Sequence, residues 1–251
     1  MIGNKLRLEW QAQTHEGKVR DHNEDALFAS DRLGVWAVAD GMGGHERGEW
    51  ASAAIVDALR HVPDLDDFDD QVSHAAGAIH QANSVIFEEA RAKSISMGST
   101  VVAVVLKDQR FAVVWAGDSR AYILREGVMH QLSRDHTRVQ ELIDRGLLTQ
   151  EQSIGHPMGH VLSRAVGVGG ELELDAIADD MHSGDVFLLC SDGLYGVVSD
   201  DEISEILANM SLEHAAQALV AKCLDNGAPD NVTVVLIKAS EATVLSLAPL
   251  V

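Results

Sequence analysis

Short runs of continuously apolar residues constrain the fold of this chain more than any other feature of its sequence. A strand that is apolar at successive positions must be covered on both faces, because neighbouring side chains point to opposite sides of a sheet. The chain therefore needs a sheet that is buried on both sides. The clearest runs are Val35–Ala39, Val113–Ala116, Val186–Cys190 and Val232–Ile237.

The remaining elements predict an α+β fold of two packed sheets flanked by helices, because neighbouring strands follow one another and the helices are grouped separately. The segment Leu147–Gly170 is irregular and predicts a surface excursion. We expect one domain over residues 1–240 and a tail over 241–251. Further strands are expected at Leu6–Gln13, Ala26–Ala29, Thr100–Leu106, Phe111–Ala116, Ala121–Leu124 and Val128–Leu132, and helices at Glu49–Leu59, Asp70–Ala90, Thr137–Arg145, Asp201–Asn209 and Leu212–Leu224.

Aspartates stand at the ends of these apolar runs. Asp40, Asp118 and Asp192 each follow one, Asp230 precedes one, and Glu24-Asp25 precedes another expected strand. Any single Asp-Gly after a strand is also an ordinary turn signal. Several carboxylates close to a core repel one another, and a shared multivalent cation relieves that repulsion. Oxygen ligands favour Mg²⁺ or Mn²⁺ over zinc.

Composition and missing motifs exclude several other functions. Lys and Arg total 19 and Asp and Glu total 39, and the resulting net charge of −20 disfavours nucleic acid and anionic lipid as partners. The sequence holds no His-Glu-x-x-His, no Cys-x-x-Cys and no phosphate-binding Gly-x-x-x-x-Gly-Lys loop. The two cysteines, Cys190 and Cys223, are expected to be buried thiols. No signal peptide or membrane-length apolar run is visible, so we expect a cytoplasmic protein.

An ordered set of short motifs resembles the PPM family, the PP2C-type serine/threonine protein phosphatases, in its compact bacterial form. Each motif alone is modest evidence, but their order from Arg20 to Thr233 is specific. The motifs are Arg20-Asp21-His22-Asn23-Glu24-Asp25, Ala39-Asp40-Gly41-Met42-Gly43-Gly44-His45, Met97-Gly98-Ser99-Thr100, Gly117-Asp118-Ser119-Arg120, Ser191-Asp192-Gly193-Leu194 and Asp230-Asn231-Val232-Thr233.

The resemblance implies a four-layer α-β-β-α sandwich of two antiparallel sheets, with two or three Mn²⁺ or Mg²⁺ ions. It implies that Asp40 bridges two ions and positions the nucleophilic water, while Arg20 binds the substrate phosphate. Arg120 is expected to be structural. The other implied metal residues are the Gly41 carbonyl, Asp192 and Asp230 on one ion, Asp25 on the second with Glu24 in its outer shell, and Asp118 with Asp192 on a third.

The implied activity is hydrolysis of phosphoserine and phosphothreonine in proteins by a metal-activated water, in opposition to a serine/threonine kinase. The expected partners are phosphorylated proteins and such a kinase, with no nucleic acid and no membrane, and the expected state is a monomer. A catalytically silent module that binds phosphoproteins is the alternative. A structural Ca²⁺ protein is a third possibility, but the chain lacks the Asp-x-Asp-x-Asp-Gly loop.

The segment from about 133 to 170 resembles the family's variable flap. Asp135-His136-Thr137 and His156-Pro157 are recognisable, and their histidines are either packing residues or flap contacts. Gly159-His160 stands where an Arg-Asn pair is common in the family. Met42 occupies the place of a histidine that is thought to protonate the leaving group in eukaryotic relatives, so the general acid is unassigned.

Overall fold

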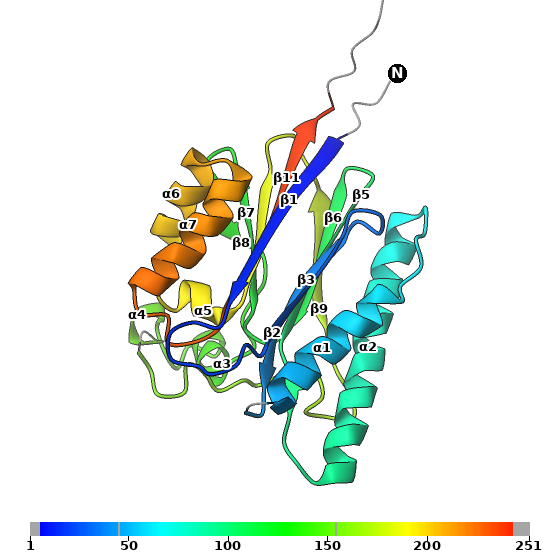
Figure 1. The fold of residues 1–251 in the computed structure, drawn as a ribbon, viewed down its shortest axis with the longest axis vertical. Helices are drawn as coiled ribbons and strands as arrows, with labels where there is room; N and C mark the ends of the chain where they lie inside the picture. Colours follow the sequence, from blue (N-terminus) through cyan, green and yellow to red (C-terminus); the bar gives the residue numbers. More distant parts are fainter. Residues whose placement is uncertain (1–5, 45, 154, 243–251) are drawn as a thin grey trace, which may run out of the picture.

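A computed structural model describes residues 6–44, 46–153 and 155–242. Two antiparallel sheets pack face to face at its centre (Figure 1). One sheet has the order β1 (Leu6–His15), β11 (Val232–Glu241), β10 (Val186–Cys190), β7 (Arg120–Arg125) and β8 (Val128–Gln131). The other has the order β2 (Asp25–Ser30), β3 (Val35–Met42), β5 (Val101–Lys107), β6 (Arg110–Ala116) and β9 (Asp175–Asp180), and the short β4 (Gly98–Ser99) pairs with β3.

Helices cover the outer face of each sheet, which confirms the predicted four-layer sandwich (Figure 1). The β2–β9 sheet is covered by α1 (Glu46–Arg60) and α2 (Phe68–Lys93). The β1–β8 sheet is covered by α5 (Asp192–Tyr195), α6 (Asp200–Asn209) and α7 (Leu212–Asp225). Two short helices, α3 (Arg138–Asp144) and α4 (Gln150–Ser153), lie in the expected flap.

Three apolar layers explain why the central strands are apolar at successive positions. In β3, Val35 and Ala37 pack toward α1 and α2, whereas Trp36 packs between the two sheets. In β10, Leu188 packs toward α7 and Phe187 packs between the sheets. Each of these strands is therefore buried on both faces, as the apolar runs predict.

Strand β9 was not predicted. Its sequence, Asp-Ala-Ile-Ala-Asp-Asp, is acidic and mostly exposed, and it joins the edge of the sheet by pairing with β6. Charged residues are common on edge strands, where they discourage pairing with other chains. The acidic composition of this segment, taken alone, therefore predicts a loop. Strand β11 extends to Glu241, the first residue of the expected tail, and residues 243–251 lie outside the described ranges.

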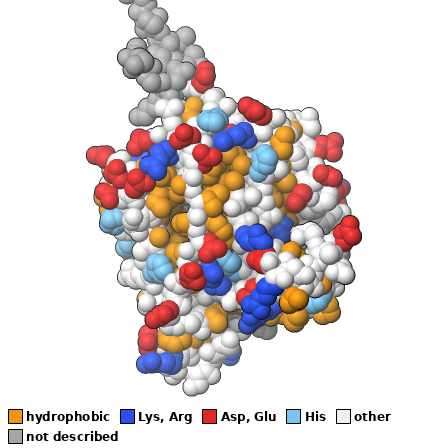
Figure 2. All heavy atoms as spheres, turned by 180° about the vertical axis from the view of Figure 1, so that it is seen from behind, with side chains coloured by type: hydrophobic (Ala, Val, Ile, Leu, Met, Phe, Trp, Pro, Cys, Tyr) orange, Lys and Arg blue, Asp and Glu red, His pale blue; other side chains and the backbone are white. Residues whose placement is uncertain are grey.

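On the face that Figure 2 shows, charged side chains lie at many separate places. Figure 2 shows acidic side chains at many places on one face, with basic ones among them. Cys190 and Cys223 are free and buried, as predicted. Across the described residues, no helix combines the length and the apolar character that crossing a membrane requires.

Candidate functional site

Sheet topology brings the aspartate-bearing strand ends to one end of the sandwich. In the antiparallel pair β2–β3, Asp25 lies directly opposite Asp40. Strand β6 runs parallel to β3 because both are antiparallel to β5, so Asp118 follows β6 at the same end. In the other sheet, β10 ends where its antiparallel neighbour β11 begins, and this places Asp192 beside Asp230.

An open cleft of about 950 Å³ collects almost all of the predicted site residues. Asp25 does not line the cleft, but its carboxylate interacts electrostatically with Asp192 and Asp230. Segments that are far apart in the chain therefore form one site. The predicted residues that line the cleft are Arg20, Glu24, Asp40, Gly41, Asp118, Asp192 and Asp230.

The backbone of Asp40 is held by the Ser99-Thr100 segment. The Asp40 amide donates to the Thr100 hydroxyl at 3.0 Å, and the Ser99 hydroxyl donates to the Asp40 carbonyl at 2.9 Å. The Thr100 hydroxyl also lies 2.6 Å from that of Ser119, which follows Asp118. A chain of hydrogen bonds thus joins the turns that carry Asp40 and Asp118.

Asp25 is held from the opposite sheet. The Ser191 hydroxyl donates to Oδ2 of Asp25 at 2.7 Å and accepts from the Thr233 amide at 3.0 Å. The buried Oδ1 of Asp25 has no hydrogen-bond partner among the described residues. A buried carboxylate oxygen without a donor is costly, and a cation would satisfy it. Asn231 fixes the same region, because its Oδ1 accepts from the Glu24 amide at 2.8 Å.

Two glycines allow close backbone contacts beside the carboxylates. A Cβ atom on Gly41 would lie 2.0 Å from the carbonyl oxygen of Gly48, and one on Gly193 would lie 1.8 Å from that of Asn231. Real Cβ atoms do not approach backbone oxygens so closely. Glycine is therefore required after Asp40 and after Asp192 for reasons of space.

Burial and mutual repulsion perturb the carboxylates. Burial, and then the neighbouring Asp192 and Asp230, raise the pKa of Asp25 to about 7 against the opposing effect of the Ser191 hydrogen bond. Burial, followed by the charges of the other aspartates, raises the pKa of Asp40 well above its usual range. The pKa of Asp118 rises to about 7, through burial and then through Asp192. Strongly raised values in one cleft are typical of functional sites.

An arginine and a histidine also contact this acidic cluster. Arg20 donates to Oδ2 of Asp230 at 2.7 Å, and Nδ1 of His160 lies 3.7 Å from Oδ2 of Asp192. Within the described residues, no three His, Cys, Asp or Glu side chains surround a common point as ligands of one ion. The carboxylates thus share a cleft without forming a complete coordination group, and Asp230 would have to share its oxygen between Arg20 and a cation.

The donor set nevertheless fits hard divalent cations. It consists of carboxylate and carbonyl oxygens, which Mg²⁺ and Mn²⁺ prefer, and Mg²⁺ usually keeps several waters as further ligands. The Asp25 oxygen without a donor and the raised pKa values of three aspartates are the features that such a cation would relieve. Arg20 supplies a planar guanidinium at the rim, suited to a phosphate group.

Several supporting residues received no individual role from the sequence. Thr100, Ser191 and Asn231 all lie inside the quoted motifs, so their position beside the aspartates was the available signal. The contacts of Ser191 and Asn231 join the two sheets, and that of Thr100 joins neighbouring segments of one sheet, which no sequence spacing reveals.

The two flap histidines differ in their surroundings. His136 is buried: its Nδ1 accepts from the Gly117 amide at 3.1 Å, and its Nε2 lies 3.1 Å from Asp175. It therefore braces the turn before Asp118. His156 contacts the amide of Met158 within the flap at 3.2 Å. Neither histidine lines the cleft, whereas His160 does.

Comparison with known proteins gives a consistent family. Residues 9–142 match the family model "Protein phosphatase 2C". The chain is 39% identical over 233 residues to the serine/threonine protein phosphatase PstP of Mycobacterium tuberculosis, covering 92% of this chain but only 45% of that relative. It is 35% identical over 236 residues to the serine/threonine phosphatase stp of Listeria innocua, covering 90% of this chain and 94% of that relative.

Solved structures agree. PppA, described as a key regulatory component of T6SS in Pseudomonas aeruginosa, superposes with a TM-score of 0.87 at 39% identity, covering 92% of this chain and 97% of that one. The catalytic domain of PstP in complex with two manganese ions superposes with a TM-score of 0.85 at 36% identity, covering 94% of this chain and 100% of that one. This chain therefore belongs to the protein phosphatase 2C family, as its motifs suggested.

Proposed function

We propose that this chain is an active, metal-dependent protein phosphatase that hydrolyses phosphoserine and phosphothreonine with Mn²⁺ or Mg²⁺. The observation that carries the proposal is the convergence of five aspartates, from both sheets, around a cleft with an arginine at its rim. Relatives named serine/threonine phosphatases support the substrate class. A catalytically silent module would have no need for so many unneutralised buried carboxylates, whose burial costs stability.

The proposed ligands are those that the resemblance to the family implies, and all of them except Asp25 line the cleft. Asp40 would bridge two cations, with the Gly41 carbonyl, Asp192 and Asp230 completing one position. Asp25 would hold the second, with Glu24 in its outer shell, and Asp118 with Asp192 would hold a third. Cations held there would supply Lewis-acid chemistry, making a coordinated water more acidic and neutralising charge on the phosphate oxygens.

The chain's own residues would bind and orient the reactants. Arg20 lies 2.7 Å from Asp230, which places its guanidinium at the edge of the carboxylate cluster, where it would hold the phosphate oxygens. Thr100 and Ser191 fix the Asp40 backbone and the Asp25 carboxylate, so neither needs to reorganise when substrate arrives.

The proposed biological setting is the bacterial cytoplasm, where the enzyme would act as a monomer in opposition to a serine/threonine kinase. Its substrates would be phosphorylated proteins. The net charge of −20 argues against nucleic acid and anionic membrane as partners.

A phosphothreonine peptide assay tests the proposal. Purified protein is assayed with Mn²⁺, with EDTA, and as Asp40→Asn, and the exposed loop variant Asp66→Asn serves as the matched control. We expect turnover only with metal, a loss of at least about 100-fold in Asp40→Asn, and full activity in Asp66→Asn. Turnover in EDTA, or an active Asp40→Asn, would refute the assignment.

A further inference from the structure

A tyrosine outside the predicted site joins two of its aspartates. Helix α5 begins at Asp192 and ends at Tyr195, whose hydroxyl donates to the backbone carbonyl of Asp118 at 2.9 Å. The same four-residue helix therefore carries Asp192 and, through the Tyr195 hydroxyl, holds the backbone of Asp118. Asp118 and Asp192 come from turns that lie more than seventy residues apart in the chain, and this hydrogen bond spans 77 residues.

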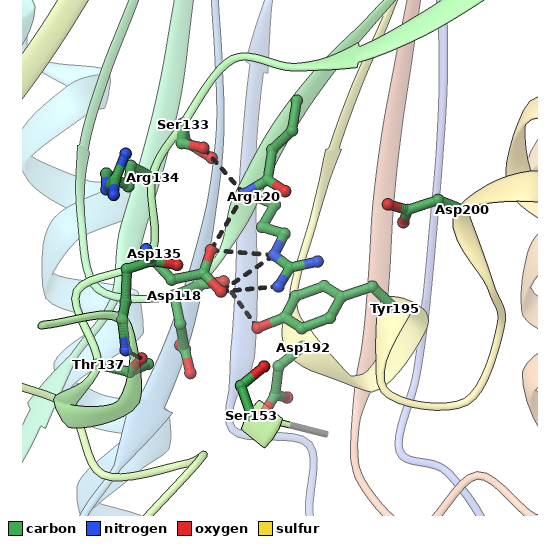
Figure 3. A network of polar contacts seen from close by, with 12 residues as sticks. Asp118, Arg120, Ser133, Arg134, Asp135, Thr137, Ser153, Asp192, Tyr195 and Asp200 are labelled. Carbon is green, nitrogen blue, oxygen red and sulfur yellow. Dashed lines mark hydrogen bonds and ion pairs between the residues drawn. The ribbon is translucent and has the colours of Figure 1, made fainter. Parts of the chain in front are cut away.

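The ring of Tyr195 is itself held in place. The guanidinium of Arg120 stacks over the ring, with its carbon 3.6 Å from the ring centroid. Arg120 in turn donates to both carboxylate oxygens of Asp135. Its Nη2 lies 2.7 Å from Oδ2, and its Nε lies 2.9 Å from Oδ1. Figure 3 shows Arg120 between Asp135 and the Tyr195 ring, with Asp118 and Asp192 beside this network. Since Arg120 follows Asp118 by two residues, the stack braces the same turn a second time.

We propose that Tyr195 is a positioning residue, whose hydroxyl sets the separation of Asp118 and Asp192 and so determines how tightly this carboxylate pair holds a cation. This inference rests on the metal assignment of the proposed function. Asp118 is buried, so its carboxylate follows the backbone that Tyr195 holds. Without that hydrogen bond, the repulsion between the Asp118 and Asp192 carboxylates would move the turn away from α5.

The chain offers a closely matched control. Tyr122 contacts the same guanidinium, because Nη1 of Arg120 donates to its hydroxyl at 3.0 Å, but that hydroxyl does not reach the Asp118 carbonyl and instead lies 3.4 Å from Asp200. Tyr195→Phe removes one hydroxyl and keeps a ring on which Arg120 can stack. Tyr122→Phe removes a hydroxyl that contacts the same Arg120 guanidinium.

Calorimetric titration of metal-free protein with Mn²⁺ separates these effects. It is run on the unaltered chain, Tyr195→Phe, Tyr122→Phe, Asp118→Asn and the double variant Tyr195→Phe/Asp118→Asn, and unfolding in EDTA checks that each variant folds. We expect Asp118→Asn to lose one class of Mn²⁺ sites and Tyr195→Phe to weaken that same class about 10-fold. The other sites should keep their affinity, Tyr122→Phe should titrate like the unaltered chain, and Tyr195→Phe should add nothing to Asp118→Asn.

Two results would overturn the inference while leaving the proposed function intact. One is an unchanged titration of Tyr195→Phe in a chain that binds Mn²⁺ normally. The other is an equal weakening of every Mn²⁺ site in both tyrosine variants, which would indicate a general loss of stability. Absence of Mn²⁺ uptake by the unaltered chain would overturn the metal assignment as well.

Discussion

Replacing Asp25 with asparagine should stabilise the metal-free protein, although Asp25 belongs to the proposed active site. Asp25 faces Asp40 across two paired strands, and like charges in directly opposed positions destabilise a sheet. Asparagine removes the charge and keeps an oxygen that can accept from Ser191. The repulsion that a cation would otherwise neutralise is thereby reduced.

The magnitude follows from the pKa of Asp25, which rises from an ordinary value of 3.8 to about 7. A difference of about three pH units corresponds to a ceiling of about 4 kcal/mol, at about 1.4 kcal/mol per unit. Asparagine does not recover the whole of this ceiling, because the neighbouring aspartates stay charged and still repel one another. We therefore expect Asp25→Asn to gain about 2 to 4 kcal/mol in unfolding free energy at pH 7.5. For a chain of this size, that raises Tm by about 5 °C or more.

The sign of the pH dependence is also determined. Between about pH 4 and pH 7, the native state holds a proton on Asp25 that the unfolded chain has released. Stability of the metal-free protein therefore falls as pH rises through this window. Asp25→Asn lacks this contribution, so its advantage should grow from pH 4 to pH 7 and then stay constant.

Urea unfolding of both proteins in EDTA, at several pH values, measures this difference, and a second series in Mn²⁺ completes the test. Because the cation binds the ionised carboxylates, the unaltered chain should gain more stability from Mn²⁺ than the variant does. The reasoning fails if Asp25→Asn is no more stable than the unaltered chain in EDTA at pH 7.5. It also fails if the difference is the same at pH 4.5.

Two further predictions concern Arg20 and Gly41, which both line the cleft. Arg20→Lys should lower kcat/KM for a phosphothreonine peptide about 10-fold at saturating Mn²⁺, because lysine cannot hold two phosphate oxygens with a planar fork. Arg32→Lys, on the surface, is the control. Equal kinetics for the two variants would count against a phosphate contact by Arg20. Gly41→Ala should lower Tm markedly in thermal melts, because the new Cβ would lie 2.0 Å from the Gly48 carbonyl oxygen. Gly77→Ala, in open space on helix α2, should instead raise stability by about 0.5–1 kcal/mol, and the opposite order would contradict the steric argument.

The strongly patterned elements could be predicted from the sequence, and the weakly patterned ones could not. Strand β10 was predicted with its observed bounds, Val186–Cys190, because every residue in it is apolar and buried. Strand β9 is acidic and becomes a strand only by pairing with β6, so its local composition favours a loop. Strand β7 was predicted at Ala121–Leu124, whereas it spans Arg120–Arg125, an error of one residue at each end that is typical of element boundaries.

In the candidate site too, some residues could be predicted from the sequence and others could not. The motifs identified the aspartates and the family, because several carboxylates at the ends of apolar runs, in a specific order, can be recognised from the local sequence alone. The supporting groups could not be assigned, since Ser191 reaches Asp25 across 166 residues and Tyr195 reaches Asp118 across 77. Such contacts depend on which strands become neighbours.

The sequence by itself determined which segments must be buried on both faces, which carboxylates stand at their ends, and hence the class of chemistry. These are local properties, set by side-chain polarity and by the alternation of strand faces. Only the tertiary structure decided that Asp25 opposes Asp40, that Arg20 contacts Asp230, and that Tyr195 joins helix α5 to the turn at Asp118. Strand pairing and sheet packing bring together residues that no local pattern relates.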